Sequence, residues 1–456
     1  MKKINRKYLF DSECSNNILE FAEDRKYFLN KSLDIKVFED ATLLPPAFIS
    51  WISSPWAKGG AVDENNDYII GSASRCLTNV SYIKKDDSTL YRLFDAYPIK
   101  ELEYCNESVF YGGPFIKQWG HFLLEFITRL WAIVQDPEKY KDMKVVFLPM
   151  RDYDEIDGTF LELLNLIGIR KEQILLLRKP TKFRSVIIPD ECVCASWFWT
   201  KEYKSLINHV ISKAMEKNVK IKTYKKIYLS RKNWALSYDR DIGEDKIERF
   251  FNQNGFKSLS MEKYSLVEQI HILQGAEHVS SAICTLPHNL IFARDGIKST
   301  IINKIPKYGI MQFLVDDMKK LEVTYIDSYL ALFPVGYGDG PFLFDINKNL
   351  ISYAKDNGMK LPKREARKDD IIKYLDLCFE KIEDFTDEEL FVFRNLYKIM
   401  RSRFQLYSNY SKRELIFKKY FHKIMWKLSL GKKNFHLEKY IKYKMKLNKM
   451  KEMYYQ

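Results

Sequence analysis

Two acid–base residues, His121 and Glu125, stand four positions apart in the first half of the sequence. Residues with this spacing share one face of a helix, where the carboxylate would orient the imidazole for removal of a proton from a hydroxyl group. Arg129 continues the line four residues later, and Gly113 and Gly120 would let a substrate approach the start of the helix. An exposed face of salt bridges explains the same spacing without any chemistry.

A second polar feature is Arg231, which directly follows the short apolar run at 226–230. Such a run predicts a strand, and the ligands of parallel sheets bind beyond the carboxyl ends of the strands. A guanidinium group in that place suits a diphosphate, because it neutralises the negative charge that develops on a leaving group of this kind. An arginine at a strand end is also common as an ordinary solvated side chain.

The third feature is the segment 280–289, which joins a predicted strand to a predicted helix. Its small hydroxylated residues, Ser281 and Thr285 among them, would let the backbone approach a ligand. His288 and Asn289 fall in the first turn of the helix, whose N–H groups and dipole favour phosphate. Ordinary helix capping with a surface histidine is the alternative, since a proline in the first turn fits it equally well.

The elements that would position these residues follow an alternation of apolar runs and amphipathic stretches from about residue 60 to residue 330. This alternation is typical of parallel sheets covered by helices on both faces. The first series predicts helices over 119–135, 159–167 and 202–219 and strands over 144–149, 173–177 and 185–189. The second predicts strands over 226–230, 256–260, 277–281 and 299–303 and helices over 244–254, 265–275 and from 287 onward.

The second series has the order of a Rossmann-like half, without the glycine-rich motif of dinucleotide enzymes or the lysine motif of P-loop proteins. Length and composition fit two such domains with an extension. We therefore expect an α/β fold with Rossmann-like domains at 1–220 and 221–333. A stretch rich in Gly and Pro at 334–341 would then open a helical extension at 334–456.

The formal net charge of +14 comes entirely from the end of the chain. Residues 398–456 hold 17 Lys and Arg against 3 Asp and Glu, which leaves 57 of each sign before them. Within this region, Leu415 to Leu430 places apolar and lysine residues at helical spacing and so predicts a basic amphipathic helix. Such a helix suits an anionic membrane surface. Packing on the body of the protein and binding of nucleic acid are the alternatives.

Other features of the sequence bear on the compartment and the metal content that we expect for the protein. Seven scattered cysteines, Cys192 and Cys194 among them, predict reduced and buried thiols in a cytoplasm. The sequence has no His or Cys motif for a metal, and we expect the Asp316–Asp317 pair on the surface. A signal peptide or a run of about eighteen apolar residues is not visible, so we expect the protein to stay where it is made.

Four motifs in a fixed order resemble landmarks of glycosyltransferase family 61. They are W-G-H-F-L-L-E with R-L-W from residue 119, Y-L-S-R ending at 231, S-L-V-E-Q-I at 265–270 and P-H-N-L-I-F-A at 287–293. The resemblance spans roughly residues 108–303. It implies an inverting, metal-independent transferase of GT-B architecture, in which two Rossmann-like domains face a cleft. Bacterial members are typically described as capsular or exopolysaccharide biosynthesis proteins, and eukaryotic relatives use UDP-linked sugars.

Matched residue by residue, the resemblance makes His121 and Glu125 the catalytic pair. The donor-binding residues that it implies are Arg231, Glu268, Gln269, His288 and Asn289. The residue patterns described above add Ser281 and Thr285 to the expected donor side, and Gly113, Gly120 and Arg129 to the expected acceptor side. Glu268 is also the third residue of a predicted capping box. The donor loop departs from the H-G-A form that is common in the family, because it has I-C-T at 283–285.

The sequence therefore predicts transfer of a sugar from a nucleotide donor, with UDP as the expected nucleotide, to a glycan or lipid-linked glycan. We expect no cofactor and no metal. The basic segment would hold the enzyme at the inner face of the cell membrane, near its acceptor. A sugar-phosphate or glycerol-phosphate transferase of the same polymer is one alternative. A non-enzymatic nucleic-acid-binding protein is the other.

Overall fold

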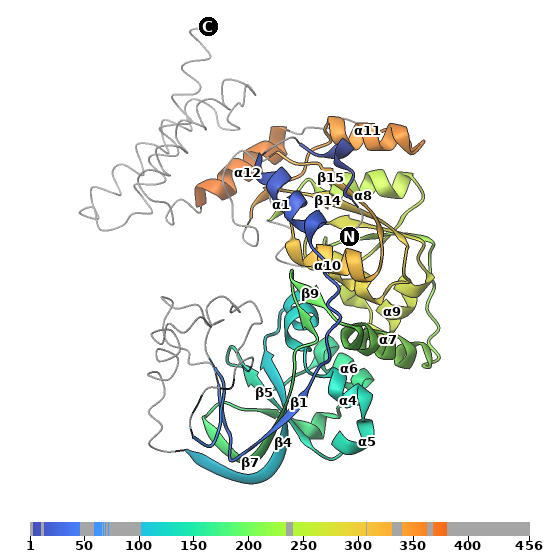
Figure 1. The fold of residues 1–456 in the computed structure, drawn as a ribbon. Coiled ribbons are helices and arrows are strands. Elements are labelled where there is room, and N and C mark those ends of the chain that lie inside the picture. The colour runs from blue at the N-terminus through green and yellow to red at the C-terminus, as the bar shows by residue number, and fades with distance from the viewer. Residues whose placement is uncertain are drawn as a thin grey trace, which may run out of the picture. The chain divides into compact units, whose positions relative to one another are not determined.

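A computed structural model describes most of the first 380 residues of the 456-residue chain (Figure 1). The described residues are 3–10, 13–45, 59–65, 67, 69, 72, 102–233, 240–306, 308–330, 340–362 and 368–380. The basic segment Leu415 to Leu430 lies outside them, as does most of the expected linker at 334–341.

The chain divides into two compact units. The larger unit holds Met1–Tyr329 and Phe344–Arg364, and the smaller unit holds Leu330–Leu343 and Glu365–Gln456. The described elements of the smaller unit are the short strand β16 (Phe342–Leu343) and the helix α12 (Lys368–Glu380). The expected division into domains at 1–220, 221–333 and 334–456 stays a prediction.

Within the described residues, the first sheet of the larger unit has seven strands. They are β1 (Ile35–Glu39), β2 (Thr42–Leu44), β3 (Gly60–Val62), β4 (Glu103–Phe115), β5 (Lys144–Pro149), β6 (Ile174–Leu176) and β7 (Thr181–Pro189). The strands β6, β5, β4 and β7 are neighbours in that order and run parallel, whereas β1, β2 and β3 add antiparallel. The order of the parallel strands is that of half a Rossmann fold, with its topological switch point between β4 and β7.

Helices cover this sheet on the side of α4 to α6 in Figure 1. The elements that follow β4 are α3 (Trp119–His121), the π-helical turn η4 (Phe122–Phe126), α4 (Trp131–Gln135), α5 (Pro137–Tyr140), α6 (Gly158–Ile167) and α7 (Lys201–Met215). The helix α6 ends at Gly168, whose left-handed φ of 107° lets its amide close the last turn. The expected helix over 159–167 and strand over 144–149 are confirmed, but the single helix over 119–135 is wrong.

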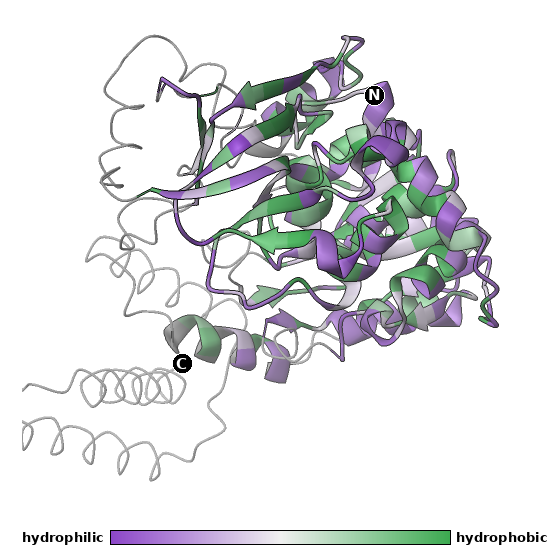
Figure 2. Ribbon diagram, turned by 90° about the horizontal axis from the view of Figure 1, so that it is seen from below, coloured by the Kyte–Doolittle hydropathy of each residue, from purple (hydrophilic) through white to green (hydrophobic). Residues whose placement is uncertain are grey.

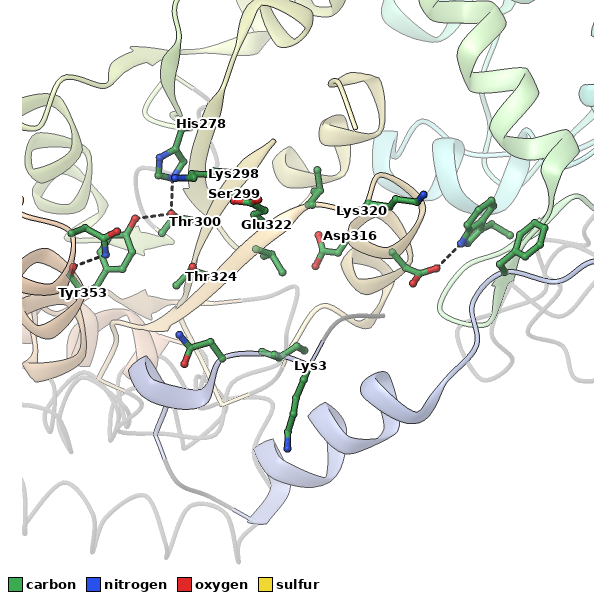
Figure 3. Close-up of a pocket in the computed structure, with 18 residues that line it drawn as sticks. Lys3, His278, Lys298, Ser299, Thr300, Asp316, Lys320, Glu322, Thr324 and Tyr353 are labelled. Atoms are coloured by element: carbon green, nitrogen blue, oxygen red, sulfur yellow. Dashed lines mark hydrogen bonds between the residues drawn. The ribbon is translucent and has the colours of Figure 1, made fainter. Parts of the chain in front are cut away.

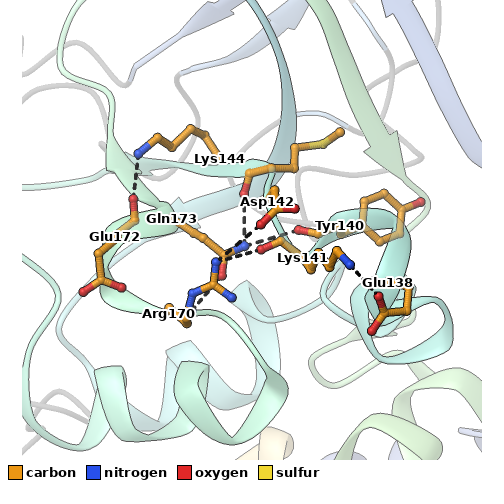
Figure 4. A network of polar contacts seen from close by, with 9 residues as sticks. Glu138, Tyr140, Lys141, Asp142, Lys144, Arg170, Glu172 and Gln173 are labelled. Atoms are coloured by element: carbon orange, nitrogen blue, oxygen red, sulfur yellow. Dashed lines mark hydrogen bonds and ion pairs between the residues drawn. The ribbon is translucent and has the colours of Figure 1, made fainter.

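A polar network fixes the edge of the first sheet (Figure 4). The side-chain amide of Gln173 donates to the carbonyl oxygens of Tyr140 and Met143 at 3.2 and 3.1 Å. Lys144 Nζ donates to the Glu172 carbonyl at 2.7 Å. Because Gln173 is buried and directly precedes β6, these bonds tie the edge strand to the turn that leads into β5.

The second sheet has five strands, all of them parallel. They are β10 (Lys226–Leu229), β12 (Lys257–Leu259), β13 (His278–Ala282), β14 (Lys298–Asn303) and β15 (Glu322–Asp327). Their spatial order is β12-β10-β13-β14-β15, the doubly wound order whose switch point lies between the first and third strands of the chain. That switch point falls between β10 and β13. The predicted parallel sheet is confirmed.

The helices of the second half are α8 (Glu244–Gln253), α9 (Leu266–Gly275), the 3₁₀ helix η7 (Leu286–Phe292), α10 (Ile310–Met318) and α11 (Lys348–Asp356). The predicted capping box forms at the start of α9, where the Ser265 hydroxyl and Glu268 carboxylate bond to each other's backbone amides. Figure 2 shows hydrophobic residues along the strands and alternating hydrophobic and hydrophilic bands on the helices, as expected for helices packed on sheets.

The N-terminal segment packs on the second sheet although it precedes the first in sequence. Tyr8 belongs to the hydrophobic core beside β10 and β15, and the Phe10 amide donates to Asp327 Oδ2 at 2.7 Å. After α1 (Glu13–Asp24), the chain joins the first sheet as β1, antiparallel to β7. The helix α7 contacts α4 and α6 of the first half and α9 of the second. These contacts join the two sheets within one unit.

Two further observations bear on the expected setting. In the described part of the chain, every helix is too short or too polar to cross a membrane. Cys192 is a buried free thiol as expected, but Cys194 is disulfide-bonded. The expectation of reduced thiols is therefore wrong for Cys194, and cysteine usage gives no support for a reducing compartment.

Candidate active site

The imidazole–carboxylate pair lies just beyond the carboxyl end of β4. The Nδ1 atom of His121 contacts Glu125 Oε2, which confirms that the two side chains share one face. Glu125 is only 3% exposed, whereas His121 is 30% exposed. The carboxylate is therefore the inner partner and the imidazole the outer one, an arrangement that fixes the ring and leaves it accessible.

The turn that carries this pair is π-helical, because the Ile127 amide bonds to the Phe122 carbonyl five residues back. Ile127 then leaves helical geometry with φ −83° and ψ 16°. Aromatic rings from β4 and α6, those of the buried Phe115 and the partly buried Phe160, pack edge-on against Phe122. Single π-helical turns occur frequently at functional sites. The expected continuous helix is interrupted at the position where the catalytic pair was predicted.

Arg129 does not continue the polar line, so that part of the prediction is wrong. Its side chain is 1% exposed and pairs at 3.1 Å with Glu191, which stands two residues after the end of β7. The guanidinium also lies over the Tyr111 ring, 5.1 Å from its centroid. Gly113 forms a bulge in β4 with φ 101°, and a Cβ there would lie 3.1 Å from an Arg129 nitrogen. Arg129 and Gly113 thus build the floor of the β4–β7 switch point.

Two cations meet one carboxylate at the switch point of the second sheet. Arg231 follows β10 and lies 3.0 Å from Asp241 Oδ2, and Lys304 follows β14 and donates to Asp241 Oδ1 at 3.0 Å. Lys304 is 3% exposed. Because these residues follow the carboxyl ends of β10 and β14, the two strands that flank β13, they form a positive edge of the kind at which a doubly wound sheet can bind an anion.

Glu244 and Cys284 complete this cluster. Burial raises the pKa of Glu244 to about 8, with the Asp241 charge acting in the same direction against Arg231 and Lys304. Glu244 is therefore largely protonated at neutral pH, and its Oε1 contacts the Tyr228 hydroxyl at 3.2 Å. Burial also raises the pKa of the Cys284 thiol, which follows β13. The two cations therefore lie beside Asp241 and beside a second carboxyl group, Glu244, that burial keeps largely protonated at neutral pH.

The loop after β13 brings the two sheets together. Trp119 Nε1 of α3 donates to Asn289 Oδ1 at 2.6 Å. A Cβ on Gly120 would lie 2.8 Å from His288 Cδ2 and 3.0 Å from Thr285 Cγ2. Gly120 is therefore needed because His288 packs directly against α3, which carries His121. The structure thus brings Gly120, Thr285, His288 and Asn289 together with His121 and Glu125.

The remaining predicted residues make contacts within the second sheet and its helix α9. The Oε2 atom of Glu268 accepts from the Ser265 amide at 2.8 Å, as the capping box requires. Gln269 is buried and its amide donates to the Tyr264 carbonyl at 3.0 Å. Ser281 is buried within β13, in register with Leu229 and Ile301.

A pocket of about 1000 Å³ lies elsewhere in the unit (Figure 3). Its wall includes His278, Lys298 and Glu322, the first residues of β13, β14 and β15. This is the amino end of the sheet, whereas ligands of doubly wound sheets bind at the carboxyl end. We therefore assign the candidate donor site to the cluster around Arg231.

The expected surface position of the Asp316–Asp317 pair is wrong for Asp316, whereas Asp317 is partly exposed. Asp316 is buried, accepts from Gln312 Nε2 at 2.9 Å and contacts the Tyr325 hydroxyl at 2.6 Å. Burial raises the pKa of Asp316 to about 7. Asp317 accepts from Trp199 Nε1 at 2.9 Å. Within the described ranges, no group of three or more His, Cys, Asp or Glu side chains is placed to hold a metal ion.

Sequence reasoning missed Lys304, Asp241 and Glu191. Lys304 could have been found, because it follows the predicted strand at 299–303 as Arg231 follows the strand at 226–230. Asp241 and Glu191 have no comparable signal in the sequence, because only the folded structure shows that each lies beside a cation from a distant segment.

Comparison with known families agrees with the geometry. The sequence model of the family described as Glycosyltransferase 61 matches residues 119–302. The matched span starts at α3 and ends within β14, so it contains His121, Glu125, Arg231 and His288. No curated protein matches the chain.

Proposed function

Residues 119–302 belong to glycosyltransferase family 61, and from this premise we propose that the protein transfers a sugar from a nucleotide donor to a glycan acceptor. The premise supports glycosyltransferase activity in general. The donor, the acceptor and the stereochemistry that follow are our proposals. The observation that carries them is that an imidazole–carboxylate pair and a two-cation edge occupy the switch points of two adjoining sheets.

The donor diphosphate binds at the β10–β13 switch point in this proposal. Arg231 and Lys304 contact its oxygens in place of Asp241 and neutralise the charge that grows as the glycosyl bond breaks. Two cations can do this work without a metal ion. The backbone of the loop after β13 then surrounds the sugar. The nucleotide is UDP in this proposal.

The acceptor hydroxyl is activated by His121. Its Nδ1 atom contacts Glu125, so Nε2 is the atom that takes the hydroxyl proton as the oxygen attacks the anomeric carbon. The carboxylate stabilises the imidazolium that forms. Attack in a single step from the face opposite the diphosphate inverts the anomeric centre. The two sheets act as the two halves of a GT-B enzyme.

The biological setting is an extension of the same proposal. We place the enzyme in the biosynthesis of a capsular or other surface polysaccharide in a bacterium, on the inner face of the cell membrane. The lysine-rich segment 415–430 would hold it there, close to a lipid-linked acceptor.

A sugar-phosphate or glycerol-phosphate transferase is the second candidate, because the same two cations would bind its donor. Product analysis separates the two candidate functions, because only the phosphate transferase leaves a phosphodiester in its product. A nucleic-acid-binding protein would use the basic segment. Nucleic-acid binding does not explain the buried charges around Asp241. It would be recognised by binding of oligonucleotides that weakens steeply as the salt concentration rises.

The test is a thermal-shift screen against UDP, GDP, CMP and their common sugar conjugates, in buffer with EDTA. We expect one nucleotide to stabilise the wild type and to leave Arg231→Ala unchanged. Lys232→Ala is the matched control, because that neighbouring side chain is 63% exposed and pairs with Glu248. Stabilisation of Arg231→Ala to the same extent as wild type would contradict the assigned donor site.

A further inference from the structure

A chain of buried hydrogen bonds runs from the loop after β13 into α10 and β15. His288 Nδ1 lies 2.8 Å from Gln312 Oε1. On its other side, Gln312 Nε2 donates to Asp316 Oδ1 at 2.9 Å. The Tyr325 hydroxyl completes the chain on Asp316 Oδ2 at 2.6 Å. These side chains are almost inaccessible to solvent, and Gln312 and Asp316 stand one turn apart on α10.

The chemistry of the chain gives it a direction. An ionised carboxylate only accepts hydrogen bonds, and a protonated one can still accept through Oδ1 while Oδ2 bonds to the Tyr325 hydroxyl. The amide nitrogen of Gln312 therefore faces Asp316, and its carbonyl oxygen faces His288. A carbonyl oxygen cannot donate. His288 must accordingly carry its proton on Nδ1.

The other edge of the His288 ring faces the catalytic pair. A Cβ on Gly120 would lie 2.8 Å from Cδ2 and 3.5 Å from Nε2, so this edge packs against α3 beside His121. Burial lowers the pKa of His288 to about 4, and the ring is neutral at physiological pH. With Nδ1 protonated, Nε2 holds a lone pair at the junction of the two sheets.

We propose that Gln312 and Asp316 are positioning residues that hold His288 in its Nδ1–H tautomer, so that Nε2 accepts a hydrogen bond from a hydroxyl group of the sugar substrate. The tautomer is a property of the protein alone. Only the last step, acceptance from a sugar hydroxyl, rests on the proposed function. This series of hydrogen bonds lies partly outside the residues that match the family model, because Gln312, Asp316 and Tyr325 all follow residue 302.

The tautomer can be measured without substrate. In ¹H–¹⁵N spectra of protein labelled at histidine, two-bond couplings show which ring nitrogen carries the proton, and His288→Gln identifies the signal. We expect Nδ1–H for His288 in the wild type. In Asp316→Asn, the new amide can donate to Gln312 Oε1 and turn the Gln312 side chain over, so we expect the Nε2–H tautomer to appear.

A double variant provides the rescue. In Gln312→Glu/Asp316→Asn the carboxylate moves to position 312, where both its oxygens accept, and the Nδ1–H tautomer should return. Asp317→Asn is the matched control, because it makes the same substitution on the same helix outside the chain. An Nε2–H signal in the wild type, or an unchanged tautomer in Asp316→Asn, would overturn the positioning role.

Activity tests the last step separately. We expect Asp316→Asn to lower kcat about tenfold or more, the double variant to recover most of it, and Asp317→Asn to keep the wild-type rate. If the tautomer changes as expected while kcat and KM do not, the assigned contact with the sugar hydroxyl is wrong. If no nucleotide stabilises the protein but the tautomer is Nδ1–H, the proposed function fails and the positioning chain stands.

Discussion

The two sheets of the larger unit place different chemistry at equivalent positions. At the β4–β7 switch point the Arg129 guanidinium pairs with Glu191, and the His121 imidazole contacts Glu125. At the β10–β13 switch point Arg231 and Lys304 share Asp241, and the neighbouring Glu244 is kept protonated by burial. In the proposed function the first edge holds a proton acceptor, and the second holds an anion.

The comparison shows that fold position locates a site but does not determine its chemistry. In the proposed function both sheets bind a substrate at a switch point, where the strand ends diverge and leave a crevice. What differs is the kind of group that the local chain brings to the edge, an imidazole beside a carboxylate in the first sheet and two cations that share Asp241 in the second. Variants that change these charges therefore test whether the two edges have different roles.

The largest effect should come from Glu125→Gln at the proton-accepting edge. The amide cannot stabilise the imidazolium that His121 forms, so we expect the transfer rate to fall by about 10²-fold to 10⁴-fold. Donor affinity should stay unchanged, because the donor edge is not altered. Initial rates and nucleotide titrations of the same preparation measure both. A loss of donor affinity equal to the loss of rate would show that the two edges do not have separate roles.

Variants of the anion-binding edge should instead lower the affinity for the nucleotide. Each hydrogen bond to a charged group contributes about 1.5–3 kcal/mol, so Lys304→Ala should weaken nucleotide binding about tenfold to a hundredfold. Arg231→Ala should weaken it more, because a guanidinium can bind two phosphate oxygens. Lys232→Ala serves as the control. Isothermal titration provides the Kd values, and wild-type affinity in Lys304→Ala would remove that residue from the donor site.

A smaller effect concerns the pH dependence of the second edge. The pKa of Glu244 is raised to about 8, so its ionisation above that pH adds a negative charge beside Arg231 and Lys304. We expect wild-type donor affinity to fall roughly fivefold between pH 7 and pH 9, for a charge interaction of about 1 kcal/mol. Glu244→Gln should show no such fall. An identical pH profile for the two proteins would contradict the role of Glu244.

The same group makes a prediction for stability. A carboxyl whose pKa is raised on folding contributes stability that is complete below its unfolded pKa and is lost as the pH rises through its folded pKa. The free energy of unfolding of wild type should therefore fall, relative to Glu244→Gln, as the pH rises from about 4.5 to 8. Urea denaturation at several pH values checks the direction.

Much of the second sheet was predictable because its signals are local. The capping box at Ser265 and the stop at Gly255, with φ 83°, define helices without knowledge of the fold. The strand at 144–149 was predicted for the same reason, since its apolar run is buried on both faces. The strand β4 was not predicted, because its first half is largely exposed and its second half contains two glycines.

The site was harder to predict because its contacts join distant segments. Arg231 could be found from its place after a predicted strand, but the sequence before its partner Asp241 has no apolar periodicity that predicts a helix or a strand. The break in the helix over 119–135 depends on aromatic packing against β4 and α6, which periodicity does not reveal. The chain from His288 to Tyr325 is likewise a tertiary feature, and its carboxylate looks like a surface residue in the sequence.

The smallest effect should come from Glu268, which the family resemblance assigns to donor binding and the structure places in a capping box. If capping is its role, Glu268→Ala should lower the free energy of unfolding by about 0.5–1 kcal/mol and leave the nucleotide Kd unchanged. Glu268→Gln should preserve both values, because glutamine completes the same box. A weakened Kd in both variants would instead extend the anion-binding edge to the start of α9. The contrast between the two sheets would then rest on three polar residues of the donor half, Arg231, Lys304 and Glu268.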